Sequence, residues 1–189
     1  MKRNKNIILV IGSLIIILAG CSKYCPDFNY SITQWMPYKE ADHILISNSN
    51  KVDTLVVNYS EITHTDKYPR FSLCLCQNIY SLTLSSDSLR INILFQDSEV
   101  IEESRININD ESLGYQKEMD HYTINGNTYQ HLIVYQNSSY TSPNRFDSII
   151  VAKSVGIISI AGPLEEWIIV DPSLKEINNS DIRFKSEDC

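Results

Sequence analysis

Apolar and polar residues alternate with a period of two along most of the chain. In the stretch 89–95, LRINILF, apolar residues occupy every second position, and Arg90 and Asn92 stand between them. Such alternation is typical of a strand with one buried face. The same reading predicts further strands at 54–59, 70–76, 104–109, 130–136, 147–152, 155–160 and 166–171.

Amphipathic helical patterns are weak, and the sequence indicates only short turns near 97–103 and 172–178. A chain made of many short strands buries its apolar faces by layering one sheet on another or by curving a sheet into a barrel. We therefore expect a mainly β fold, either a single antiparallel β-sandwich or an open, barrel-like sheet.

One hairpin can be predicted from its turn chemistry. The pair Asn125-Gly126 lies between two strand-like stretches. Both residues tolerate the positive φ angles that a type I′ turn requires. Residues 122–124 should therefore pair with residues 127–129.

Two other glycines mark places where a strand should end or distort. Gly162-Pro163 breaks the preceding strand, and another should begin near Glu166. Gly156 lies inside an apolar strand, which predicts either a bulge or an aromatic ring lying on the backbone. Trp167 is the candidate for that ring.

The first 20 residues have the layout of a signal peptide. Residues 1–6, MKRNKN, carry three cations and no acid, and an apolar run follows from Ile7 to Ala19. A helix needs about 20 apolar residues to cross the hydrocarbon core of a bilayer. This run is too short for that and has the length of a signal h-region.

The apolar run ends in LAGC at 18–21, which resembles the lipobox of bacterial lipoproteins. Small residues before the cysteine let a processing enzyme cut between Gly20 and Cys21, and the Cys21 thiol takes the lipid. Cys25 does not fit this role, because a charged and a bulky residue precede it. Two or three acyl chains on Cys21 would give a stable anchor. The alternative is an ordinary cleaved signal that meets a cysteine by chance.

The residues after Cys21 predict where the anchored protein resides. Ser22 stands where lipoproteins retained in the inner membrane often carry aspartate. The acidic run that directs some lipoproteins to the cell surface is missing from 22–28, SKYCPDF. We therefore expect a protein on the outer membrane that faces the periplasm.

The chain is acidic, and this limits its partners. Its formal net charge is −7, and removal of the three cations in residues 1–20 takes it to −10. Nucleic-acid binding depends on Lys and Arg, so that class is excluded, and lipid rather than a basic patch must hold the protein to a membrane. We expect residues 21–31 to form the lipidated cysteine and a short tether, and residues 32–189 a single domain.

Four cysteines besides Cys21 are candidates for disulfides. On a strand, Cys74 and Cys76 would leave the same face about 7 Å apart, which is awkward for a bond between them. They could pair with Cys25 and Cys189, and the three possible connectivities stay open. The oxidising compartment favours at least one disulfide. A soft-metal clasp and buried free thiols are the alternatives.

No catalytic motif is recognisable, so we predict no catalytic residue, metal or cofactor. The four histidines have no catalytic or metal-binding spacing: His43, His64, His121 and His131. His64 and Asp66 could offer two metal ligands from one strand, which is a weak signal.

The adjacent acids at 102–103 and 165–166 are most simply exposed loop ends, although glycosidase carboxylates can come from any part of a chain. The 11 tyrosines should mostly fill the core, with stacking on sugars as the alternative.

Several short stretches form a recognisable set: CPDF (25–28), WMPY (35–38), DTLVV (53–57), the close cysteines 74 and 76, INGNTYQHLIVY (124–135), DSIIVAKSVGIISI (147–160) and EEWIIV (165–170). With these elements the chain resembles a family of uncharacterised bacterial lipoproteins. The resemblance implies a β-rich lipoprotein with a lipobox signal and a disulfide-prone N-terminal half. It also implies that Cys25 pairs with Cys74 or Cys76. The family has no established activity to transfer.

Three functional hypotheses follow. The leading one is a lipid-anchored envelope lipoprotein whose periplasm-facing domain acts by binding, or as an accessory, toward an envelope protein or a glycan. The second is an envelope hydrolase, directed at glycans, that uses scattered carboxylates. The third is a thiol or metal protein built on Cys74 and Cys76.

Overall fold

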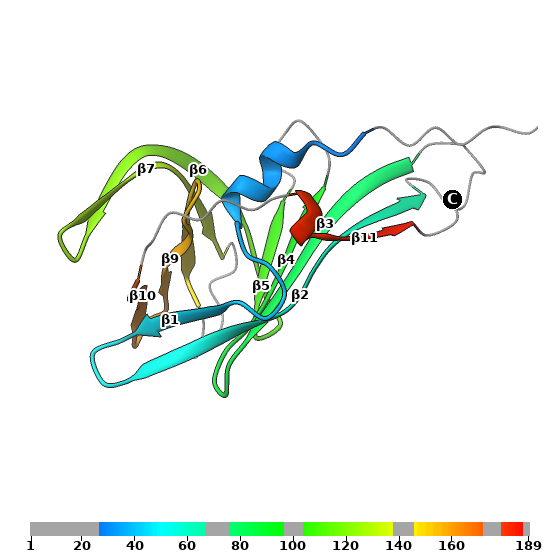
Figure 1. Cartoon of the computed structure of the whole chain (residues 1–189). Helices are drawn as coiled ribbons and strands as arrows, with labels where there is room; N and C mark the ends of the chain where they lie inside the picture. Colours follow the sequence, from blue (N-terminus) through cyan, green and yellow to red (C-terminus); the bar gives the residue numbers. More distant parts are fainter. Residues whose placement is uncertain (1–26, 67–75, 97–103, 138–145, 172–178, 187–189) are drawn as a thin grey trace, which may run out of the picture.

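The computed structural model describes residues 27–66, 76–96, 104–137, 146–171 and 179–186, and the structural statements below concern those residues. Their strands form one sheet, so the predicted mainly β fold is confirmed (Figure 1). The elements in chain order are η1 (Tyr30–Trp35), β1 (His43–Ser47), β2 (Val52–Asp66), β3 (Cys76–Ser85), β4 (Arg90–Gln96), β5 (Arg105–Ile108), β6 (Glu111–Ile124), β7 (Asn127–Gln136), β8 (Ser148–Ala152), β9 (Gly156–Ala161), β10 (Glu166–Ile169), η3 (Asn179–Asp181) and β11 (Arg183–Ser186).

The sheet closes on itself. Strands β2 to β10 follow one another as antiparallel neighbours. β1 then pairs with β10 through Ile46 and Ile169 and with β2 through Ile44 and Leu55, which joins the two ends of the meander. β11 adds in parallel to the second half of β2. The sheet is barrel-like, as one of the two predicted arrangements has it, but it is closed where the prediction has an open sheet, and the pairing of β11 is parallel. Closure protects strand edges that an open sheet would expose.

Side chains fill the interior of this ring. One layer crosses four neighbouring strands, because Tyr135 pairs with Ile149, Ile149 with Ile160, and Ile160 with Trp167. These four residues are at most 1% exposed. Burying each large apolar side chain contributes roughly 1.5–3 kcal/mol, so this part of the ring is packed core rather than space for a ligand.

The segment before β1 covers one end of the ring, and we call residues 28–38 the plug. The Asn29 side chain accepts a hydrogen bond from the Ser31 amide at 3.1 Å and thereby caps the start of η1. Met36 and Tyr38, which follow η1, are fully buried. The Tyr38 hydroxyl accepts a hydrogen bond from the Ile157 amide at 2.8 Å. Figure 1 shows η1 (blue) lying across this end of the sheet.

The two predicted turns are confirmed. Asn125 and Gly126 have φ angles of 49° and 79°, as a type I′ turn requires. Residues 122–124 pair with residues 127–129 in the predicted register. In the second turn, the Gly162 amide donates to the carbonyl oxygen of Glu165 at 2.8 Å, and β10 begins at the next residue.

An aromatic ring does lie on the backbone of Gly156, but it belongs to Tyr38. A Cβ atom added at Gly156 would overlap the Tyr38 ring and hydroxyl, and Gly156 has a φ of +93°. The prediction that Trp167 provides the ring is therefore wrong. A register shift between β8 and β9 is present as well, but it lies at Ile158, between the pairs Ile150–Ser159 and Val151–Ile157, and Gly156 itself pairs with Ala152.

The alternation pattern does not predict β1, β11, most of β3 or the first part of β6. β6 carries mostly exposed polar residues along its length, so it lacks a regular buried face. The predicted strand at 70–76 is described only at Cys76, and the turns predicted near 97–103 and 172–178 lie outside the described residues. The predicted signal segment, residues 1–20, also lies outside them. None of the helices in the described parts of the chain is long and apolar enough to cross a membrane.

Candidate binding groove

β6 and β7 extend beyond their neighbours in the sheet. β5 pairs with β6 only as far as Gly114, and β8 pairs with β7 only from Leu132 onward. Residues 115–131 therefore form a two-stranded ribbon, which we call the arm. Figure 1 shows the arm (yellow-green) curving away from the rest of the ring.

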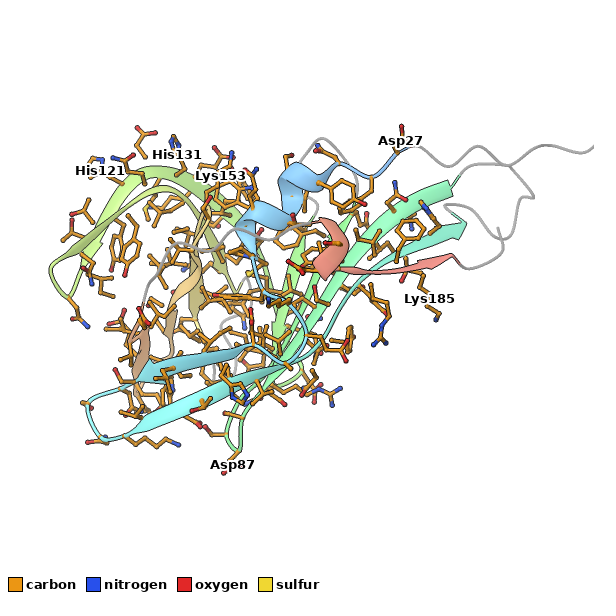
Figure 2. The ribbon with its side chains drawn as sticks, viewed as in Figure 1. Asp27, Asp87, His121, His131, Lys153 and Lys185 are labelled. Carbon is orange, nitrogen blue, oxygen red and sulfur yellow. The ribbon has the colours of Figure 1, made fainter. Side chains whose placement is uncertain are left out.

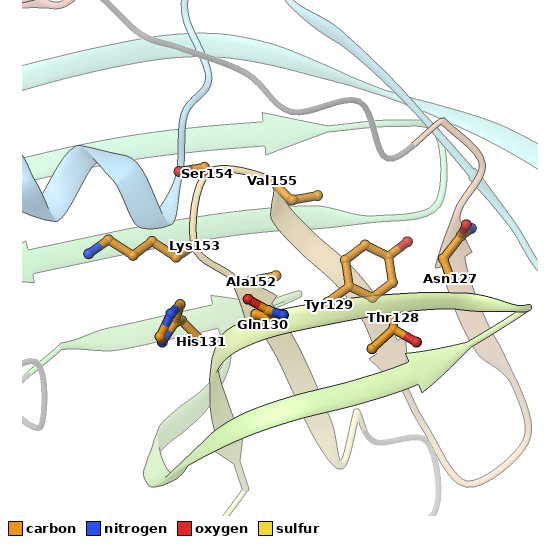
Figure 3. A pocket seen from close by; sticks show the side chains of 9 residues that line it. All are labelled: Asn127, Thr128, Tyr129, Gln130, His131, Ala152, Lys153, Ser154 and Val155. Atoms are coloured by element: carbon orange, nitrogen blue, oxygen red, sulfur yellow. The ribbon is translucent and has the colours of Figure 1, made fainter.

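A groove lies between the arm and the turn that joins β8 to β9. Its larger part is a hollow of about 520 Å³, lined by residues 127–131 of the arm and 152–155 of the turn (Figure 3). A smaller hollow of about 150 Å³ is lined by Trp35 of the plug, residues 118–120 and Leu132. His131 and Lys153 line both hollows, so we treat the two as one binding groove.

His131 occupies an unusual backbone conformation at the junction of the hollows. Its φ is 53°, although it lies inside β7. The pairs Met119 with Leu132 and His121 with Gln130 flank it, and its carbonyl oxygen accepts a hydrogen bond from the Lys153 amide at 3.0 Å. A positive φ costs energy in residues that have a Cβ, and such strain gathers at functional sites.

The larger hollow is lined mainly by uncharged polar groups. Asn127, Thr128 and Gln130 supply amides and a hydroxyl from one strand, and all three are exposed. Tyr129 lies among them with only 7% of its surface exposed. Burial raises the pKa of the Tyr129 hydroxyl, and a hydrogen bond with the Asn127 side chain partly offsets this effect.

The smaller hollow carries charges of both signs. Glu118 and Asp120 are exposed acids on β6, and Lys153 is an exposed cation on the turn. Within the described structure, none of these three side chains forms an ion pair. Figure 2 shows His131 and Lys153 close together at one end of the molecule, far from Asp87 at the opposite end. The charged groups of the groove are therefore open to a ligand.

Most of the cysteines predicted as sites lie outside the described residues. These are Cys21 with the cleavage position Gly20, and Cys25, Cys74 and Cys189. The disulfide and lipidation assignments stay predictions.

Cys76 is described only through its backbone, which pairs with Asp66 at the start of β3. Two residues away, His64 pairs with Asn78 and with Ser186 of β11, so β2, β3 and β11 meet at one end of the sheet. The His64 ring packs edge-on against Phe184, with the ring centroids 4.5 Å apart. Among the described residues, no three His, Cys, Asp or Glu side chains are grouped so that they could hold a metal ion.

The acids predicted as exposed loop ends at 165–166 are exposed and make structural hydrogen bonds. Glu165 accepts from the Asn48 side chain at 2.7 Å, and Glu166 accepts from the Ser159 hydroxyl at 2.8 Å. The other acidic pair, 102–103, lies outside the described residues. The 165–166 pair thus ties β10 to β1 and β9 and has no part in the groove.

A third hydrogen-bonded acid lies at the opposite end of the ring from the groove. Asp53 accepts hydrogen bonds from the hydroxyls of Ser86 at 2.9 Å and Ser88 at 2.7 Å, and from the Thr54 amide. Desolvation would raise the pKa of Asp53, but the bonds from Ser88 and Ser86 outweigh it and hold the pKa below its usual value. These bonds fix the β3–β4 turn and do not involve a ligand site.

Comparisons of the chain with protein-family models, with curated proteins and with solved structures gave no significant match. The groove was not predictable from motifs, because it depends on how the arm curves. The nearest signal in the sequence is the presence of amide and aromatic side chains directly after the Asn125-Gly126 turn.

Proposed function

We propose that the protein is a lipid-anchored envelope lipoprotein, held to the outer membrane through Cys21 and facing the periplasm, whose domain acts by binding. The observation that supports binding is the groove of about 520 Å³, which lies outside a ring with a packed interior. A hollow of this size falls within the range of about 300–1,000 Å³ that small ligands occupy.

The tether would bring the plug end of the ring close to the bilayer. Asp27, the first described residue, follows Cys21 by six positions, so a fully extended tether reaches roughly 20 Å. The plug begins at the next residue, and its Trp35 borders the groove. A ligand in the groove would therefore be held near the membrane that carries the protein.

The anchor is tested by metabolic labelling with palmitate and by membrane fractionation of cells that express the full chain. We expect label in the wild type, and loss of both label and membrane attachment in Cys21→Ala. Cys25→Ala is the matched control and should stay labelled and membrane-bound. Unlabelled wild type, or a Cys21→Ala protein that stays in the membrane fraction, would show that Cys21 is not the anchor.

The binding role is tested by photo-crosslinking in cells. A photoreactive residue replaces Gln130 in the groove or, as the control, Asp87 at the opposite end of the ring (Figure 2). We expect a defined adduct from position 130 and none from position 87. Equal labelling at both positions, or none at 130, would count against the groove as the working surface.

A hydrolase remains the second candidate, because Glu118 and Asp120 both line the smaller hollow. Two carboxylates beside a polar groove are the groups that glycoside hydrolysis uses. Glu118→Gln and Asp120→Asn separate the hypotheses: a hydrolase would lose turnover of a bound glycan, whereas a binding domain shows no turnover in the wild type.

A further inference from the structure

We infer that the binding groove takes a saccharide carrying a short branch with both an amine and a carboxylate, such as an amino sugar with a peptide side chain. This inference rests on the proposed binding function and adds the class of ligand. Each hollow would bind one part of this ligand. The larger hollow is neutral and polar, and the smaller hollow is charged.

The larger hollow matches the body of a saccharide. A sugar presents hydroxyls that both donate and accept hydrogen bonds, and the exposed Gln130 amide can do the same. The Asn127 amide bonds Tyr129 and the Thr128 hydroxyl bonds Thr123, and each keeps further hydrogen-bonding capacity toward the hollow. Tyr129 lines the same wall, but only 7% of its surface is exposed, so it offers a sugar a narrow apolar edge and not an open face for stacking. In Figure 3 the Tyr129 ring lies between the arm and the β8–β9 turn.

The smaller hollow matches a branch that carries both charges. Lys153 offers an ammonium group for a carboxylate, and Glu118 and Asp120 offer carboxylates for an amine. A purely anionic ligand would meet these two acids, and a purely cationic one would meet Lys153. Since like charges repel at short range, a branch with both signs fits this hollow better than a branch with one.

His131 connects the two parts. It lines both hollows, and its positive φ falls where the arm departs from the ring. The bond from the Lys153 amide to its carbonyl oxygen fixes the turn against the arm at this point. The strained residue thus sets the distance between the neutral and charged hollows, in keeping with strain found at ligand clamps.

Calorimetric titration of the detergent-solubilised full-length lipoprotein with three probes tests this assignment. The probes are a neutral N-acetylglucosamine tetrasaccharide, a disaccharide carrying a stem peptide, and the free stem peptide. We expect the branched saccharide to bind about tenfold or more tightly than either other probe, because it engages both hollows.

Single substitutions in each hollow separate the contributions of the saccharide and of its branch to the affinity. Gln130→Ala should weaken both saccharides, whereas Lys153→Met should weaken only the branched one, by about three- to tenfold. Lys153 is exposed, and within the described structure its side chain forms no ion pair, so the fold should be kept, and circular dichroism checks this. Asp87→Asn, at the far end of the ring, is the control and should change neither affinity.

Two results would overturn the ligand assignment while leaving the binding function intact. One is equal affinity for the neutral and the branched saccharide, or a Lys153→Met variant that weakens both equally. The other is a crosslink at position 130 that joins the groove to a protein and not to a saccharide. Failure of the crosslink at position 130 together with no affinity for any probe would refute both proposals.

Discussion

The turn that joins β8 to β9 has two sides with opposite properties. On the plug side, the Ser154 amide donates to the carbonyl oxygen of Gln34 at 2.6 Å and the Ile157 amide donates to Tyr38. On the groove side, the Lys153 side chain is exposed and forms no ion pair within the described structure. The same few residues therefore anchor the plug on one side and leave polar groups for a ligand on the other.

This contrast separates what holds the fold from what could bind. Substitutions on the plug side remove buried contacts or leave buried donors unpaired, and both are costly. Substitutions on the groove side affect exposed groups and cost little stability. Residues of the groove should therefore tolerate changes that residues of the plug do not.

The largest expected effect is alkaline unfolding through the buried tyrosines. Burial raises the pKa of Tyr80 to about 12, against 10.0 for an exposed tyrosine, and raises the pKa values of Tyr38 and Tyr135 as well. Since the folded-state pKa lies above the unfolded one, their stabilisation is complete below pH 10 and is lost as the pH rises toward 12. Between the unfolded-state and folded-state pKa, each buried tyrosine should lower the free energy of unfolding by about 1.4 kcal/mol per pH unit.

Urea unfolding between pH 8 and pH 11.5, followed by absorbance of the phenolate, measures this loss. Tyr80→Phe should make the decline shallower by about 1.4 kcal/mol per pH unit. Phenolate absorbance that develops near pH 10 for all tyrosines in the still-folded protein would mean that Tyr38, Tyr80 and Tyr135 are not buried.

A series of three glycines ranks next. Gly156→Ala combines a φ of +93° with overlap of the Tyr38 ring, and we expect a loss of about 4 kcal/mol or more. Gly126→Ala has a φ of +79° but open space around it, so it should cost about 1 kcal/mol. Gly114→Ala has neither problem and should leave the thermal midpoint nearly unchanged.

Equilibrium unfolding of the three variants gives the comparison directly. If Gly156→Ala is no worse than Gly126→Ala, the plug is not packed against β9 as described. The double variant Gly156→Ala with Tyr38→Leu then shows whether the ring is the cause, because removing the ring should recover part of the loss.

Tyr38→Phe should have a smaller effect. The variant keeps the ring but removes the acceptor for the Ile157 amide, and an unpaired buried donor costs about 1–3 kcal/mol. Tyr59→Phe is the matched control because Tyr59 is 37% exposed. Hydrogen exchange at the Ile157 amide should accelerate in Tyr38→Phe only; unchanged protection would mean that this bond is not what holds the plug.

The parts of the fold that the sequence predicts are those set by local chemistry. The alternation at 89–95 matches β4, since a strand with one buried face must alternate. Asn125-Gly126 predicts its hairpin and register because the turn itself requires positive φ. Ring closure by β1 is not predictable in this way, because β1 and β10 lie far apart in the chain and only their packing joins them.

The aromatic partner of Gly156 shows the same limit. The glycine itself signals a close approach, but the sequence does not identify the ring: Trp167 is predicted and Tyr38 is found, because the plug enters the end of the ring. The groove is further from prediction, since the φ of His131 and the curve of the arm come from tertiary contacts. An alternating pattern contains no information about either.

A small effect on stability is expected from His131→Gly, which tests the groove side of the turn most directly. Glycine accepts a φ of 53° without strain, so the unfolding free energy should stay within about 1 kcal/mol of the wild type and shift upward. His121→Gly, at an exposed and unstrained position of the same arm, should instead lose about 0.5–1 kcal/mol of unfolding free energy.

His131→Gly should nevertheless lower the affinity for the branched saccharide by about three- to tenfold, because a more flexible junction must be ordered on binding. Higher stability together with weaker binding would show that the strained backbone at His131 contributes to ligand binding. Lower stability with full affinity would show that His131 has only a structural role.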